Sequence, residues 1–265
     1  MEFEPNNGKK WLQSVVDSLP RLDEILRNNS SETLIIGAAV FDIYFAQGWV
    51  PEFKRKTADV DLSIGLVRNA DAYEATCKAL LDARYRQDKD RPYRYFPEKE
   101  SPGALAYVDV LAHPATTDVS DQRARTAMGV GPNFSLTAMP FARKEAFSIE
   151  EKIFFPNPIG FIALKLHAYQ DEPLKRIKDL ADIAELVWGL VEKGTHFQLE
   201  NLWTKIKSDQ EAAFVRQALR ELGGGTSVRW DLDSARDELA TRSFSTTDLD
   251  DVIPERLIEI VEFLG

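Results

Sequence analysis

The chain has 265 residues with 44% hydrophobic content, enough for one large domain or two modest ones with a filled core. No stretch approaches the roughly 20 apolar residues of a membrane-spanning helix, and residues 1–5 are too acidic for a secretory signal, so we expect a cytoplasmic protein with no membrane partner. The formal charge of -10 argues against sequence-independent binding of long nucleic acid but leaves a local basic groove open. The single cysteine, Cys77, excludes a disulfide framework and a cysteine-based zinc site.

The first half of the chain alternates helical and strand-like patterns. Apolar residues at helical spacing predict a helix over residues 11–28, and residues 33–36 predict a strand that ends at Gly37. Residues 38–47 predict a helix that stops at Gly48. The expected unit is a strand, a tight glycine turn and a helix.

Acidic residues lie in the next two expected strands. Apolar residues alternate with Asp59 and Asp61, which is the period of a half-buried strand, so both carboxylates are expected on one face. A helix is predicted over residues 70–84, and residues 104–111 predict a strand that contains Asp109.

A break in the pattern indicates a domain boundary. Residues 133–155 predict further strands or loops, and Pro156 and Pro158 then bracket the break. We expect an α/β domain over residues 1–157 and a helical domain over residues 158–265. The expected helices of the second domain cover residues 159–169, 174–190, 197–222 and 254–264, and the turns and linkers cover residues 223–225 and 231–251.

Three carboxylates in adjacent strands require a nearby positive charge. Asp59, Asp61 and Asp109 would repel one another unless a cation lay among them. Divalent magnesium takes oxygen ligands from a few carboxylates and keeps its other positions for water and substrate phosphates, and Mn²⁺ accepts the same ligands. The pattern favours phosphoryl or nucleotidyl transfer, and two solvent-facing acids on an edge strand are the alternative.

Gly37 adds a second indication of a phosphate site. A glycine at the start of a helix lets the backbone approach a ligand, and the helix amino terminus offers unpaired N–H groups to phosphate. An ordinary glycine between a strand and a helix is the alternative.

Together these residues resemble the DNA polymerase β-type nucleotidyltransferase superfamily. Its pattern is Gly-Gly or Gly-Ser at a helix start, then Asp-x-Asp, then a third carboxylate, and residues 37–38, residues 59–61 and Asp109 occupy these places. Ala38 departs from the pattern, because the hydroxyl or second glycine that helps to hold the phosphates is missing.

Within that superfamily the chain looks most like the AbiEii/AbiGii toxin group. In that group a strand-helix hairpin leads into an arginine and then Asp-hydrophobic-Asp-Leu, similar to residues 36–44 and 55–62. A lysine on one helix and a basic-Asp-x-x-Asp pattern on the next are similar to residues 163–168 and 176–183.

The resemblance implies an α/β (α+β) fold, with a polymerase β-like domain of a small mixed sheet flanked by helices and then a helical domain. It also implies an enzyme that moves a nucleoside monophosphate from an NTP to an acceptor hydroxyl with Mg²⁺ (or Mn²⁺). A toxin-like role, tRNA or other RNA as the acceptor and a cognate antitoxin partner are implied as well. The implied catalytic residues are Asp59, Asp61, Asp109, Lys165 and Asp179, the first three as metal ligands, and the implied nucleotide contacts are Gly37, Ala38, Arg55 and Lys165.

Charged residues of the second half allow two interpretations. Lys165 lies in an apolar helix from which it could reach a triphosphate, and a snorkelling surface lysine is the alternative. Asp179 and Asp182 are three residues apart on one helix side, as in a solvated salt-bridge face. The resemblance instead makes Asp179 the carboxylate that orients Lys165 or the nucleotide.

Residues 84–99 interleave arginines with aromatic residues, a composition that contacts the bases and phosphates of RNA. A solvated hairpin with some core aromatics is the alternative.

Two other functions remain open from the sequence. One keeps the fold with a small-molecule acceptor, as in aminoglycoside nucleotidyltransferases, and the acidic overall charge favours it. The other is a degenerate, non-catalytic nucleotide-binding module, which the alanine at position 38 favours.

Overall fold

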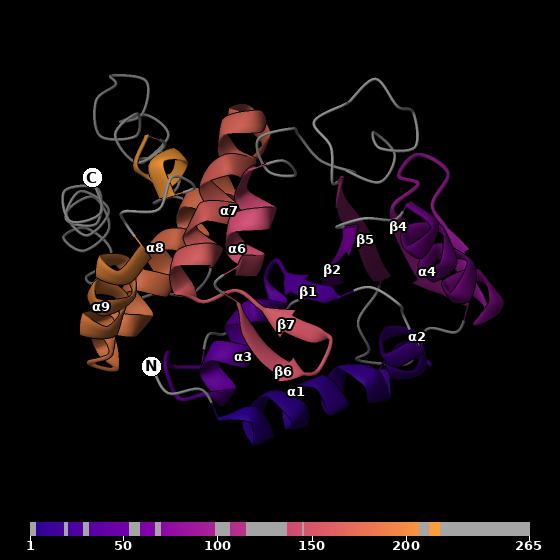
Figure 1. Cartoon of the computed structure of the whole chain (residues 1–265), viewed down its shortest axis with the longest axis horizontal. Coiled ribbons are helices and arrows are strands. Elements are labelled where there is room, and N and C mark those ends of the chain that lie inside the picture. The colour runs from indigo at the N-terminus through magenta and orange to yellow at the C-terminus, as the bar shows by residue number, and fades with distance from the viewer. Residues whose placement is uncertain are drawn as a thin grey trace.

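The computed structural model describes residues 4–18, 21–28, 32–52, 59–66, 70–98, 107–114, 137–144, 146–206 and 212–217. Over these residues the chain is a mixed α/β protein in which a central sheet is flanked by helices (Figure 1). The expected α/β class is therefore confirmed, and the polymerase β-like fold stays a prediction.

Seven strands of the described chain pair into one mixed sheet. They are β1 (Thr33–Ile36), β2 (Asp59–Leu66), β3 (Tyr85–Gln87), β4 (Arg94–Pro97), β5 (Tyr107–Pro114), β6 (Phe147–Glu150) and β7 (Ile153–Phe155). Their spatial order is β3-β4-β5-β2-β1-β7-β6, with β2–β5 and β1–β7 parallel and the other pairs antiparallel. The two strands that carry the acidic residues, β2 and β5, are thus neighbours inside the sheet.

Helices cover the sheet on both sides. They are α1 (Pro5–Ser18), α2 (Leu22–Asn28), α3 (Ala39–Ala46), α4 (Ala70–Asp82), α6 (Met139–Lys144), α7 (Pro158–Asp171), the 3₁₀ turn η2 (Pro173–Lys175), α8 (Ile177–Glu192) and α9 (His196–Ile206). Figure 1 shows α6 and α7 standing above the sheet, with α1 running beneath it.

The two faces of the sheet enter different hydrophobic clusters. Leu34, Ile36 and Leu111 are buried together with apolar residues of α6 and α7. Neighbouring residues of the same strands, such as Ile35 and Val110, point to the other face and belong to the larger core. Because Ile36 is the register partner of Asp61, the acidic positions belong to the face that α6 and α7 cover.

The larger core runs across the predicted domain boundary. The rings of Phe41 in α3 and Phe161 in α7 meet edge to face at 5.1 Å, and the Tyr44 hydroxyl donates a hydrogen bond of 2.9 Å to the carbonyl of Pro156. The sequence break lies where α7 begins, since the Asn157 side chain caps the helix by accepting from the Gly160 N–H. The division into domains stays a prediction, and one core serves both segments.

Two expected elements are wrong in part. The helix over residues 11–28 is two helices, because Arg21 has a φ of +60° that no α-helix accepts and Pro20 precedes it. Residues 133–155 contain the short helix α6 besides strands. Within the helix expected over residues 197–222, the described residues 197–206 and 212–217 are helical. The expectations for residues 223–225, 231–251 and 254–264 fall outside the described residues.

Among the described residues, no helix is long and apolar enough to cross a membrane.

Candidate functional site

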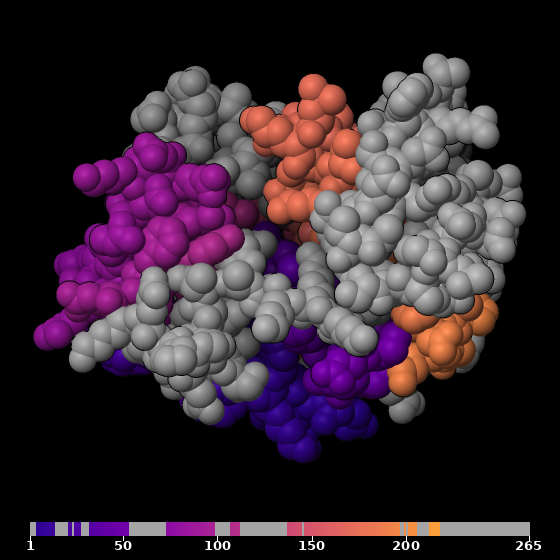
Figure 2. Space-filling view, turned by 180° about the vertical axis from the view of Figure 1, so that it is seen from behind, coloured from indigo at the N-terminus to yellow at the C-terminus, as the bar shows by residue number. Residues whose placement is uncertain are grey.

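A cleft of about 780 Å³ lies between the sheet and the helices that follow it. One wall consists of the end of β1 with Gly37, the β3–β4 hairpin and β5, and the other consists of α7, η2 and the start of α8. Figure 2 shows a hollow between the surface of residues 73–98, in magenta, and the salmon end of α7. Segments from both halves of the sequence therefore form one cavity.

The strand register brings the predicted carboxylate positions together. Asp61 of β2 is the Cα partner of Asp109 of β5, and Asp59 is the partner of Tyr107. Directly paired residues of parallel strands belong to the same face of a sheet. The backbone thus places the three acidic positions on the face that borders the cleft; the side chains of Asp59 and Asp61 are outside the described part.

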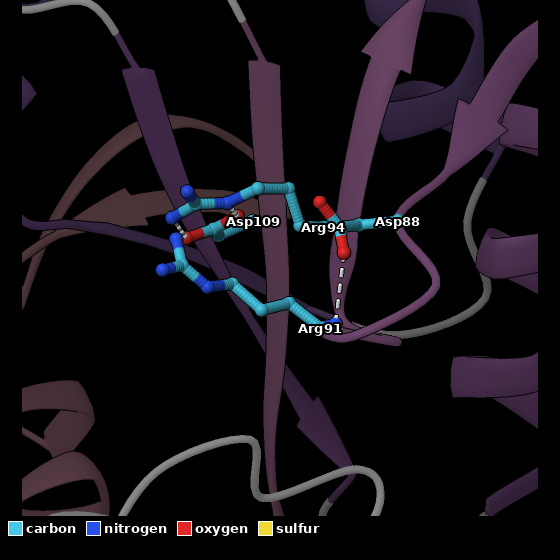
Figure 3. Close-up of polar contacts among 4 residues, drawn as sticks. All are labelled: Asp88, Arg91, Arg94 and Asp109. Atoms are coloured by element: carbon cyan, nitrogen blue, oxygen red, sulfur yellow. Dashed lines mark hydrogen bonds and ion pairs between the residues drawn. The ribbon is translucent and has the colours of Figure 1, made fainter.

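Asp109 is already bound by an arginine. Arg94, its cross-strand partner in β4, donates from Nε to Oδ1 at 2.7 Å and from Nη2 to Oδ2 at 2.6 Å (Figure 3). The Arg94 guanidinium also stacks over the Tyr107 ring, with Cζ 3.7 Å from the centroid. Hydrogen bonding to Asp109 raises the pKa of Arg94 above its ordinary value. Both oxygens of the third predicted carboxylate are engaged in a nearly buried pair.

The residues fit a divalent metal in type and in backbone position. Three aspartates supply the hard oxygen ligands that Mg²⁺ and Mn²⁺ prefer, and Asp61 and Asp109 are direct neighbours across two strands. Among the side chains that the structure describes, no group of three or more His, Cys, Asp or Glu is arranged to hold a metal. The assignment of Asp59, Asp61 and Asp109 as metal ligands remains a prediction.

The glycine turn has the conformation that the sequence predicts. Gly37 follows β1, borders the cleft and has a φ of +78°, which glycine adopts without the steric strain that a Cβ adds. Ala38 precedes α3 and forms no side-chain cap, as expected from its missing hydroxyl. The predicted nucleotide contact Arg55 falls outside the described residues.

Lys165 and Asp179 are in direct contact. Lys165 Nζ lies 2.9 Å from Asp179 Oδ1 and 2.5 Å from Asp182 Oδ2, and Arg176 Nε lies 2.5 Å from Asp179 Oδ2. Lys165, Asp179 and Asp182 are all buried. The two alternative predictions, a lysine that snorkels to the surface and a solvated acidic helix face, are therefore wrong. This buried group connects α7 to α8 and borders the cleft through Lys165.

The cleft is rich in cations, and it brings together basic residues that the sequence motifs indicated only separately, such as Lys165 and arginines of residues 84–99. Its described lining contains six basic side chains against three acidic ones, although the whole chain is acidic. The basic residues are Arg91, Arg94, Lys165, Lys175, Arg176 and Lys178, and the acidic residues are Asp109, Asp171 and Glu172.

The interleaved segment over residues 84–99 supplies both cleft and core residues. Tyr85 and Tyr95 are buried in the core, whereas Arg91 and Arg94 enter the cleft. Asp88 shapes the hairpin, because its Oδ1 accepts from the N–H groups of Asp90 and Arg91, which lowers the pKa of Asp88 (Figure 3). The composition of the segment indicated the basic side chains, but only the turn decided which of them face the cleft.

No protein-family model, curated protein or solved structure matches this chain. The site residues therefore rest on the motifs and on the geometry of the cleft.

Proposed function

We propose that this protein is a nucleotidyltransferase of the polymerase β type that moves a nucleoside monophosphate from an NTP to an acceptor hydroxyl. The observation that carries the proposal is the cleft itself. On the sheet side of the cleft, Asp61 and Asp109 are paired positions of neighbouring strands, and Gly37 forms a turn at the end of β1. On the helix side lies Lys165 with further cations. Acidic positions for a metal and basic groups for a triphosphate thus border the same space.

The reaction is a displacement at phosphorus. The acceptor hydroxyl gives up its proton to solvent as its oxygen forms a bond to the α-phosphorus of the NTP. The bond from that phosphorus to the oxygen that bridges it to the β-phosphate breaks, and pyrophosphate leaves with the electron pair. Bound at Asp59, Asp61 and Asp109, Mg²⁺ (or Mn²⁺) would lower the pKa of the attacking hydroxyl and neutralise charge on the phosphates. The Gly37 turn offers backbone N–H groups to the triphosphate, and Lys165 offers a point charge held by its buried partners.

The charge of the lining favours an anionic acceptor such as a tRNA or another RNA. A cationic small molecule, as in aminoglycoside transfer, would meet six basic side chains among the described lining residues. An RNA end instead brings phosphates that Arg91 and Lys178 can contact on opposite walls. A toxin-like role and a cognate antitoxin belong to this proposal through the family resemblance alone.

Label transfer tests the proposal directly. The purified protein is incubated with each radiolabelled NTP, Mg²⁺ and either total RNA or an aminoglycoside. Asp59→Ala is tested alongside, with Glu192→Gln, a change of an exposed residue at the end of α8, as the control. We expect transfer with at least one NTP, its loss in Asp59→Ala and its retention in the control. Absence of transfer with every NTP would contradict the proposal. Transfer to a cationic small molecule but not to RNA would contradict the assignment of RNA as the acceptor.

A non-catalytic nucleotide-binding module is the second candidate. Two observations favour it, since Ala38 forms no side-chain cap and Arg94 binds both oxygens of Asp109. This candidate predicts nucleotide binding without turnover. Pyrophosphate release that Asp61→Asn abolishes would eliminate it.

A further inference from the structure

The Arg94–Asp109 pair lies where the proposed metal and nucleotide must bind. Asp109 has Asp61 as its register partner on one side and Arg94 on the other. Arg94 is therefore a cation that the chain itself supplies to this acidic position. Only 14% of the Arg94 side chain and 7% of the Asp109 side chain are exposed, so water screens the pair weakly.

The pair uses the same oxygens that a metal would need. Two short charge-assisted hydrogen bonds occupy Oδ1 and Oδ2 of Asp109, and the Tyr107 ring supports the guanidinium from below. A carboxylate held in this way gives its oxygens to a divalent cation only when the guanidinium withdraws. Arg94 and a divalent cation consequently compete for Asp109.

A withdrawn Arg94 would remain inside the cleft. Arg94 lines the same cavity as Gly37 and Lys165, the residues proposed to hold the triphosphate. A guanidinium matches phosphate oxygens in the same two-pronged geometry with which it holds a carboxylate. The cleft thus offers Arg94 a second anionic partner when a nucleotide is present.

We propose that Arg94 is a positioning residue that exchanges partners, holding Asp109 in the empty cleft and contacting the triphosphate once Asp109 turns to a divalent cation. This inference rests on the proposed function. It assigns Arg94 a role that none of the sequence motifs contains. The exchange couples the two ligands, because each favours the state in which Arg94 has left Asp109.

Binding of Mn²⁺ alone tests the first half of the exchange without any turnover. It is measured by the decrease in the electron paramagnetic resonance signal of unbound Mn²⁺. We expect Arg94→Gln to bind Mn²⁺ at least about tenfold more tightly than the wild type, since a charge-assisted pair no longer opposes the metal. Arg94→Gln combined with Asp109→Asn should lose this gain. Lys175→Gln is the matched control, because it removes one cation from the same cleft, paired with Glu172 and not with Asp109, and its Mn²⁺ affinity should change less than that of Arg94→Gln.

Binding of a non-hydrolysable NTP analogue with Mn²⁺ tests the second half. Arg94→Gln should weaken it by about tenfold, opposite in sign to the effect on Mn²⁺ alone, whereas a merely structural role would weaken both. If Arg94→Gln fails to fold, Arg94→Lys keeps the charge but loses the two-pronged geometry, and it should also tighten Mn²⁺ binding. Unchanged or weaker Mn²⁺ binding in the folded variants would overturn the exchange even if label transfer is observed. Tighter Mn²⁺ binding with weaker analogue binding would support it even if no transfer is found.

Discussion

Lys165 and Asp179 form an ion pair of 2.9 Å in the protein interior, where the Asp179 side chain is fully buried. The pair joins α7 to α8, and Asp182, one turn further along α8, holds the same ammonium group. Arg176 contacts Asp179 from the side of the cleft. Two acids and two bases therefore balance one another at the helix wall of the cleft and keep Lys165 in place.

Removal of Asp179 should destabilise the protein strongly. Asp179→Ala leaves Arg176 and part of the Lys165 charge without their partner, and we expect the free energy of unfolding to fall by about 3 kcal/mol. Lys175→Ala, which breaks the exposed pair with Glu172, should cost less than about 0.5 kcal/mol. Urea unfolding followed by tryptophan fluorescence compares the two, and equal losses would contradict the buried pair.

A side chain at Gly37 should affect both stability and binding. Gly37→Ala puts a Cβ on a backbone with a φ of +78°, and we expect a loss of about 1 kcal/mol with weaker binding of an NTP analogue. Gly48→Ala is the matched control, since Gly48 has a φ of +72° and nothing within 4 Å of an added Cβ. Both variants should melt at lower temperature, and a comparable loss of nucleotide affinity in Gly48→Ala would contradict the role of the turn.

The salt dependence of RNA binding should report on the cleft cations. Lys178 is exposed at the start of α8 and lines the cleft, so Lys178→Gln should weaken RNA binding and flatten the slope of log affinity against log salt by about 0.7. Lys193→Gln at the opposite end of the same helix should leave the slope as it is. Filter binding across a salt series measures both, and identical slopes in all three proteins would refute a phosphate contact at Lys178.

Stability should decline in alkaline solution. Burial raises the pKa of the Tyr44 and Tyr73 hydroxyls above their ordinary value of 10.0, so the folded state keeps protons that the unfolded state loses. The contribution of each hydroxyl to the free energy of unfolding is therefore fully present below pH 10.0 and is lost as the pH rises from there toward the pKa in the folded state. For the fully buried Tyr44 the loss is about 1.4 kcal/mol per pH unit.

Tyr44→Phe separates this effect from others. The substitution should lower the free energy of unfolding by about 1 kcal/mol at neutral pH, because the hydrogen bond to the Pro156 carbonyl is lost. At high pH the stability of the variant should fall less steeply than that of the wild type. Urea unfolding from about pH 8 to about pH 11 gives the two slopes. Parallel slopes would show that Tyr44 ionises equally in both states.

Much of the local structure could be predicted from the sequence. The alternation around Asp59 and Asp61 predicts β2, and the apolar run before Gly37 predicts β1 and the turn, because these patterns express the two-residue period of a strand and the φ of a glycine. The helix break at Arg21 was missed, since helical spacing of apolar residues continues through Pro20.

The sequence by itself determined which residues carry the charges and on which elements they lie. Only the tertiary structure decided that Asp109 faces Arg94, that Lys165 is enclosed by Asp179 and Asp182, and that the basic residues of two distant segments line one cleft. The reason is physical, because a periodic pattern reports the face of a single element, whereas the partner of a charge depends on strand order and register and on helix packing between residues far apart in the chain.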